Sequence, residues 1–109
     1  MTDTFKVLAQ SDPSADTLTD IYTVPASTST TVSSIIVSNR SASATTFRIS
    51  VAVGGAVNSN EQYIHYGVAI TGNNTYIATI GMTLAATDVI RVYAEDATLS
   101  FNIFGVEVT

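Results

Sequence analysis

The side chains of this chain that could take part in chemistry are one histidine, scattered carboxylates and five tyrosines. His65 is the only histidine, and no sequence neighbour of it would complete a catalytic triad or a metal site. We therefore interpret His65 as a strand histidine that is packed or hydrogen-bonded locally. Cysteine is absent, which excludes a thiol nucleophile, a thiolate metal site and disulfides.

Carboxylates occur in two groups that could hold calcium from loops. The first group recurs every four residues and consists of Asp12, Asp16 and Asp20. The second surrounds the last predicted connection and consists of Asp88, Glu95 and Asp96. Neither spacing matches the alternating acids and terminal Glu of an EF-hand loop. We interpret these residues as solvated turn acids and predict no metal site.

Five tyrosines offer a possible sugar-stacking surface, since amphipathic rings are common at binding sites. They are Tyr22, Tyr63, Tyr66, Tyr76 and Tyr93. However, Tyr63 and Tyr66 are three residues apart and would face opposite sides of an ideal strand. This spacing favours tyrosines in the core or at a subunit interface over a shared platform. We predict no enzyme and no cofactor; a small hydrolase would need an acid or base cleft that the sequence does not indicate.

Composition limits the partners of this protein. The formal net charge is −5, and the four basic residues, Lys6, Arg40, Arg48 and Arg91, are scattered in sequence. This predicts no nucleic-acid partner and no attraction to anionic membranes. Charged residues make up only 12% of the chain, whereas 17 Thr and 12 Ser supply polar surface. Such short side chains lose little rotamer entropy when a partner covers them, as an interface requires.

Strand-length apolar segments repeat along the chain and are separated by Ser, Thr, Asn and Gly clusters. The cleanest alternation is Thr45 to Val53, with Phe47 and Ile49 opposite Arg48 and Ser50. The other predicted strands are Phe5 to Ala9, Leu18 to Val24, Val32 to Ser38, Gln62 to Ile70, Thr75 to Ile80, Val89 to Ala94 and Leu99 to Val108. Gly81 to Thr87 is consistent with a helical turn, a bent connection or a strand, and Gly105 suggests a kink or bulge.

The strand count predicts an all-β protein: a single antiparallel β-sandwich of about eight strands. Jelly-roll and Ig-like connectivity cannot be distinguished from the sequence. We expect residues 1–16 to form an N-terminal strand or arm and residues 17–109 to form the sandwich. We expect no signal peptide and no membrane helix, because no apolar run of signal-peptide length follows the N-terminus and no later run approaches the roughly 20 apolar residues of a membrane helix. Because open sheet edges attract partners, we expect Phe5 to Gln10 or Leu99 to Val108 to contact another subunit.

Five stretches of the chain resemble a family of short virion structural proteins of tailed bacteriophages. They are DTLTDIYTVPA (Asp16 to Ala26), VSSIIVSNRS (Val32 to Ser41), ATTFRISVAVGG (Ala44 to Gly55), GMTLAATDVIRVYA (Gly81 to Ala94) and LSFNIFGVEV (Leu99 to Val108). The shared pattern is a strand ending in Val-Pro-Ala, an Asn-Arg turn and a Leu-x-Ala-x-Asp-Val-Ile segment.

The resemblance implies a structural component of the virion: a capsid decoration or cement protein, or a part of the neck, tail or baseplate. Such a protein would be made in the host cytoplasm, self-associate, and pack against other virion proteins of the capsid or tail scaffold. No functional residue carries over from the family. The alternative is a carbohydrate-binding or receptor-binding module of a phage fibre, using Tyr63, Tyr66 or Tyr93 with neighbouring Asn and Asp.

Overall fold

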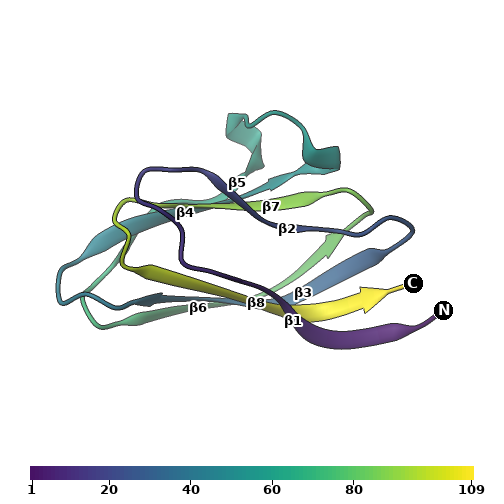
Figure 1. Cartoon of the computed structure of the whole chain (residues 1–109), viewed down its shortest axis with the longest axis horizontal. Coiled ribbons are helices and arrows are strands. Elements are labelled where there is room, and N and C mark those ends of the chain that lie inside the picture. Colours follow the sequence, from purple (N-terminus) through teal and green to yellow (C-terminus); the bar gives the residue numbers. More distant parts are fainter.

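The chain forms two antiparallel four-stranded sheets, which lie as two layers in Figure 1. The computed structural model describes all 109 residues, Met1–Thr109. The strands are β1 (Asp3–Ser11), β2 (Thr19–Thr23), β3 (Ser29–Asn39), β4 (Thr45–Ala52), β5 (Tyr63–Ile70), β6 (Thr75–Leu84), β7 (Val89–Ala94) and β8 (Leu99–Val108). Two short 3-10 turns, η1 (Val53–Gly55) and η2 (Asn60–Gln62), connect β4 to β5. The predicted all-β sandwich of about eight strands is confirmed.

Strand pairing identifies the sandwich as a jelly roll. The sheets have the orders β1-β8-β3-β6 and β2-β7-β4-β5. The first strand pairs with the last, β2 with β7, β3 with β6 and β4 with β5. This is the pairing of one long hairpin rolled into a double layer, which is how a jelly roll is built. The sheet pairing thereby excludes the Ig-like alternative.

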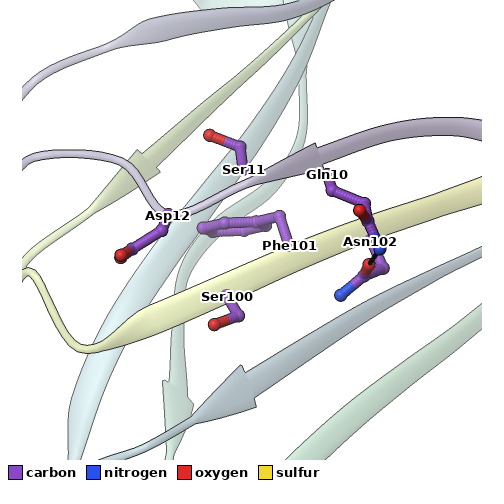
Figure 2. A pocket seen from close by; sticks show the side chains of 6 residues that line it. All are labelled: Gln10, Ser11, Asp12, Ser100, Phe101 and Asn102. Carbon is purple, nitrogen blue, oxygen red and sulfur yellow. Dashed lines mark hydrogen bonds between the residues drawn. The ribbon is translucent and has the colours of Figure 1, made fainter.

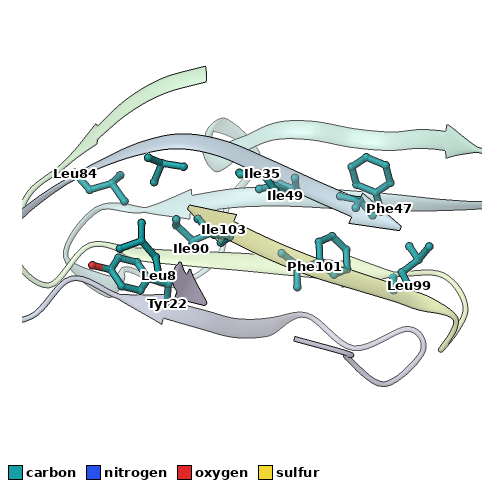
Figure 3. Packing of buried hydrophobic residues seen from close by; sticks show 14 of the residues in the cluster. Leu8, Tyr22, Ile35, Phe47, Ile49, Leu84, Ile90, Leu99, Phe101 and Ile103 are labelled. Atoms are coloured by element: carbon teal, nitrogen blue, oxygen red, sulfur yellow. The ribbon is translucent and has the colours of Figure 1, made fainter. Parts of the chain in front are cut away.

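The core fills the space between the two sheets. Side chains at alternate strand positions point inward, as the period of two predicts. Phe47 and Ile49 from one sheet face Phe101 and Ile103 from the other, and all four are fully buried. Figure 3 shows this layer of aliphatic and aromatic side chains running along the sandwich. The shared inward face predicted for Phe47 and Ile49 is therefore confirmed, whereas β4 ends at Ala52, one residue before the predicted end at Val53.

Extra residues lie beside Gly105, and not in its own strand. β8 keeps a regular alternation from Leu99 to Val108, while β1 carries one extra residue at Leu8 and β3 one at Ser33. The kink or bulge was expected in β8 itself, but the extra residues lie in its two neighbouring strands, β1 and β3. Gly105 is required for another reason: a Cβ atom there would lie 2.2 Å from the carbonyl oxygen of Thr31.

Two other segments are clarified by the sheet pairing. The segment after Ile80 continues as strand to Leu84, because Met82 and Leu84 still pair with β3. The N-terminal segment forms the edge strand β1, whose Leu8 belongs to the core. β8, in contrast, lies between β1 and β3. Of the two segments expected to contact another subunit, only β1 therefore has an unpaired edge.

Candidate functional site

Aromatic and cationic side chains gather on the outer face of the β2-β7-β4-β5 sheet. Arg48 lies between the buried residues Phe47 and Ile49 of β4, so its side chain points outward. Tyr93 occupies the equivalent outward position on β7 and pairs directly with Arg48 across the two strands. The alternation of both strands, combined with their register, brings these two side chains together.

Irregular pairing of β5 adds two more rings to this face. Between the pairs Phe47–Val68 and Ile49–His65, β5 has one residue more than β4. The extra residue lies beside Gly67, whose φ of 62° is favourable only for glycine. β5 has a second extra residue, Ile64, between the pairs Ile49–His65 and Ser50–Tyr63. This shift lies between the two tyrosines, and their rings meet edge to face with their centres 5.0 Å apart. The prediction that these tyrosines face opposite sides was wrong, because it assumed an ideal strand.

We call Arg48, Tyr63, Tyr66 and Tyr93 the Arg48 platform. The guanidinium carbon of Arg48 lies 4.3 Å from the ring centre of Tyr66 and 4.4 Å from that of Tyr93. Cation–π attraction to both rings holds the guanidinium in place. Tyr66 is 62% exposed, so the platform is open to solvent.

Hydrogen bonds at the rim fix the outer tyrosines. The Tyr93 hydroxyl donates to Asp16 Oδ1 at 2.7 Å, and this bond to a carboxylate raises the pKa of Tyr93. On the opposite side, Asn58 Nδ2 donates to the Tyr63 hydroxyl at 3.1 Å. Asn58 belongs to the η1–η2 connection, which rises above β4 and β5 in Figure 1.

Arg91 anchors this connection to the sheet. Its Nη1 donates to the carbonyl of Ala56 at 2.8 Å, and its Nε donates to Asp20 Oδ1 at 2.7 Å. Lys6 pairs with Glu107, and Arg40 pairs with Asp12. Each of these three cations has an acidic partner, whereas the side chain of Arg48 forms no salt bridge or hydrogen bond within the chain.

His65 lies on the inner side of β5, away from the platform. Its Nε2 is 3.1 Å from the Tyr76 hydroxyl of β6, so the pair joins the two sheets. Its Nδ1 is buried without a partner, and burial lowers the pKa of the imidazole. Phe47 packs against both rings. This is the packed, hydrogen-bonded strand histidine that we predicted.

The carboxylates that were considered for calcium are dispersed. In the first group, Asp12 and Asp20 pair with arginines and Asp16 accepts the Tyr93 hydroxyl. The carboxylates of the second group are also hydrogen-bonded within the chain. Asp88 accepts hydrogen bonds from the backbone N–H groups of Gly54 and Ala85. Glu95 accepts one from the Thr46 hydroxyl, and Asp96 accepts one from the Thr45 hydroxyl. No three His or acidic residues are grouped as metal ligands.

One depression is found on the surface, between the ends of β1 and β8 (Figure 2). Its lining is mainly polar, and the Gln10 and Asn102 side chains are hydrogen-bonded across it at 2.9 Å. Asp12 is its only charged residue, and that carboxylate already accepts from Arg40 at 2.6 Å. The depression therefore brings together no pair of titratable groups that could act as acid and base.

The outer face of the β1-β8-β3-β6 sheet is apolar near its β1 edge. Phe5 pairs with Val106, and Val7 pairs with Phe104. Phe5 is 78% exposed although it is one of the largest apolar side chains. Ile36 and Ile77 form a further outward pair on β3 and β6. We call the six residues Phe5, Val7, Ile36, Ile77, Phe104 and Val106 the apolar face.

None of the helical turns has the length or apolarity to cross a membrane. The chain matches no model of a known protein family, and no curated protein is significantly similar to it.

Proposed function

We propose that this chain is a structural component of a tailed-phage virion that acts by packing against other subunits. Its place is that of a capsid decoration or cement protein, or of an accessory protein of the neck, tail or baseplate. The observation that carries the proposal is the apolar face. A monomer in water gains nothing by exposing large apolar side chains at directly opposed positions of two paired strands, and covering them is favourable.

The position of the apolar face supports contact between whole subunits. It begins at β1, whose outer edge has no strand partner. A partner that covers Phe5 and Val7 therefore also reaches backbone groups that are free to pair. Thr31 and Ser34 lie beside Val106 and Phe104 and give the face a rim of short polar side chains. Ordering such a rim costs little side-chain entropy.

Fold and sequence pattern agree with this role. Jelly rolls are common in viral capsid and lectin domains, and the five stretches that resemble phage virion proteins include β2, β4, β7, β8 and most of β3. In a particle, many copies repeat the same contact by symmetry, so a modest interface becomes durable through avidity. The protein is made in the host cytoplasm and is then held in the virion by the capsid or tail scaffold and by its own copies.

Two experiments test the proposal. Mass spectrometry of purified virions should detect this polypeptide in stoichiometric amounts, and its absence would refute the virion role. Sedimentation velocity should show self-association, or co-sedimentation with particles that lack the protein. The double variant Phe5→Ser/Val106→Ser should lose that association. Val57→Ser is the matched control, because Val57 is 89% exposed on the η1–η2 connection and lies outside the apolar face.

The second candidate function is a carbohydrate-binding or receptor-binding module of a phage fibre. The Arg48 platform favours it, because exposed tyrosine rings and adjacent amide and carboxylate groups are a usual composition for a ligand-binding surface. The two candidates use opposite outer faces of the sandwich. Loss of association after changing the apolar face and loss of ligand binding after changing the platform are therefore separate results.

A further inference from the structure

We propose that the Arg48 platform binds a glycan through a single carboxylated sugar, such as a sialic or uronic acid. The inference rests on the second candidate function and goes beyond it by naming the group that is recognised. Its starting point is the state of Arg48. This is the only basic side chain of the protein without an acidic partner, although the chain carries nine acidic residues.

The two tyrosine rings orient Arg48 for a ligand. The ring centres of Tyr66 and Tyr93 lie 4.3 and 4.4 Å from the guanidinium carbon of Arg48. They restrain the side chain but satisfy none of its N–H donors, because ring faces attract charge without accepting conventional hydrogen bonds. A guanidinium has five donors in a rigid planar fork that matches a carboxylate bidentately. A restrained fork also loses less side-chain entropy on binding.

The neighbouring groups favour a sugar as the carrier of that carboxylate. Tyr66 is 62% exposed and touches Tyr63, so apolar ring surface lies next to the charged group. A pyranose ring has C–H-rich faces that pack on aromatic rings and hydroxyl groups at its edge. The Tyr63 hydroxyl and the Asn58 amide, hydrogen-bonded at 3.1 Å, lie at the rim, where such hydroxyl groups would bind.

The surrounding charge disfavours ligands with many negative charges. Asp16 binds the Tyr93 hydroxyl, and Glu95 binds the hydroxyl of Thr46, which lies two residues before Arg48 on the same face of β4, so both carboxylates lie near the platform. The net charge of −5 adds repulsion. Nucleic acids and polyacidic peptides need several cationic side chains to neutralise them. The platform offers only one, the guanidinium of Arg48. A glycan with one acidic sugar and otherwise neutral sugars supplies one carboxylate for Arg48 and adds no further negative charge.

Matched glycans test the role of the carboxylate without changing the protein. An array with sialylated, uronic-acid-containing and neutral glycans should give binding to acidic members only. Titration calorimetry should then show 3′-sialyllactose, or a glucuronic-acid-terminated oligosaccharide, binding about tenfold or more tightly than its own methyl ester. Equal binding of acid and ester, binding to neutral glycans alone, or no binding to any glycan would overturn the proposal. So would preferential binding of single-stranded DNA or a poly-glutamate peptide.

Variants test the role of Arg48. Arg48→Gln should lose about tenfold or more in affinity for the acidic glycan. Arg48→Lys keeps the charge but lacks the planar fork, so it should bind more weakly than the wild type. Arg40→Gln is the matched control, since Arg40 is bound to Asp12, and it should bind normally. Thermal melts followed by circular dichroism check that each variant is folded. If folded Arg48→Gln binds like the wild type, the assignment is wrong, whereas the packing role of the apolar face is unaffected.

Discussion

The hydroxyl of Tyr22 donates a 2.6 Å hydrogen bond to Glu107 Oε2 and thereby joins β2 of one sheet to β8 of the other. The same hydroxyl is 2.8 Å from Thr30 Oγ1, and Lys6 Nζ donates to the other oxygen of Glu107 at 3.2 Å. Both sheets and four strands meet in this network. The carboxylate accepts donors from two sides, which lowers the pKa of Glu107, the Tyr22 bond being the main cause.

Removing the Tyr22 hydroxyl should destabilise the sandwich. In Tyr22→Phe the ring keeps its place, but Glu107 loses a hydrogen bond in a mostly buried position, its side chain being 13% exposed. Hydrogen bonds to charged groups contribute about 1.5–3 kcal/mol, and urea unfolding should show a loss of this size. Tyr93→Phe also removes a hydroxyl bonded to a carboxylate, but at an exposed site, and should cost much less. Equal losses in both variants would contradict the structural role of the network.

The network also predicts a loss of stability at alkaline pH. Burial, together with the hydrogen bond to Glu107, raises the pKa of Tyr22 from 10.0 to about 12. The folded protein therefore keeps its proton where the unfolded chain has lost it. This stabilising contribution is complete below pH 10 and is lost as the pH rises through about 12. Urea midpoints measured from pH 9 to 12 should fall more steeply for the wild type than for Tyr22→Phe.

The layers of the fold could be predicted from sequence because they follow from local alternation. Phe47 and Ile49 are buried because a strand alternates its side chains, whatever it pairs with. The jelly-roll pairing could not be predicted in this way. It joins Asp3 to Val108, at opposite ends of the chain. The alternation of side chains within one strand does not determine which other strand it pairs with.

The platform was missed for the same reason. Arg48 was expected on the face opposite Phe47 and Ile49, but only the β4–β7 register makes it a neighbour of Tyr93. The position of Tyr66 had a usable sequence signal in Gly67, since an isolated glycine within a strand often marks a bulge. The other extra residue, Ile64, lies between Tyr63 and Tyr66 and has no such signal, so an ideal alternation applied through it put the two tyrosines on opposite faces.

Acidification should destabilise the protein through His65. Burial lowers the pKa of its imidazole below the ordinary value of 6.5. The unfolded chain therefore binds a proton at a pH where the folded protein does not, and stability declines as the pH falls below 6.5. His65→Gln retains a polar partner for Tyr76 but cannot titrate. Between pH 7.5 and 5.5 its urea midpoint should change less than that of the wild type, and an NMR titration of His65 with a midpoint at or above 6.5 would refute the argument.

Two glycines in strands of the same sheet provide a matched test of close packing. A Cβ atom at Gly105 would lie 2.2 Å from the Thr31 carbonyl oxygen and 2.9 Å from Leu8 Cδ1, whereas at Gly81 it would meet nothing within 4 Å. Gly105→Ala must therefore push β3 away from β8, and we expect a loss of about 3 kcal/mol or more in unfolding free energy. Gly81→Ala should be neutral or slightly stabilising, because alanine restricts the unfolded chain. Urea unfolding of both variants should separate them clearly; a Gly105→Ala protein as stable as Gly81→Ala would mean that β8 and β3 are not as close as their pairing requires.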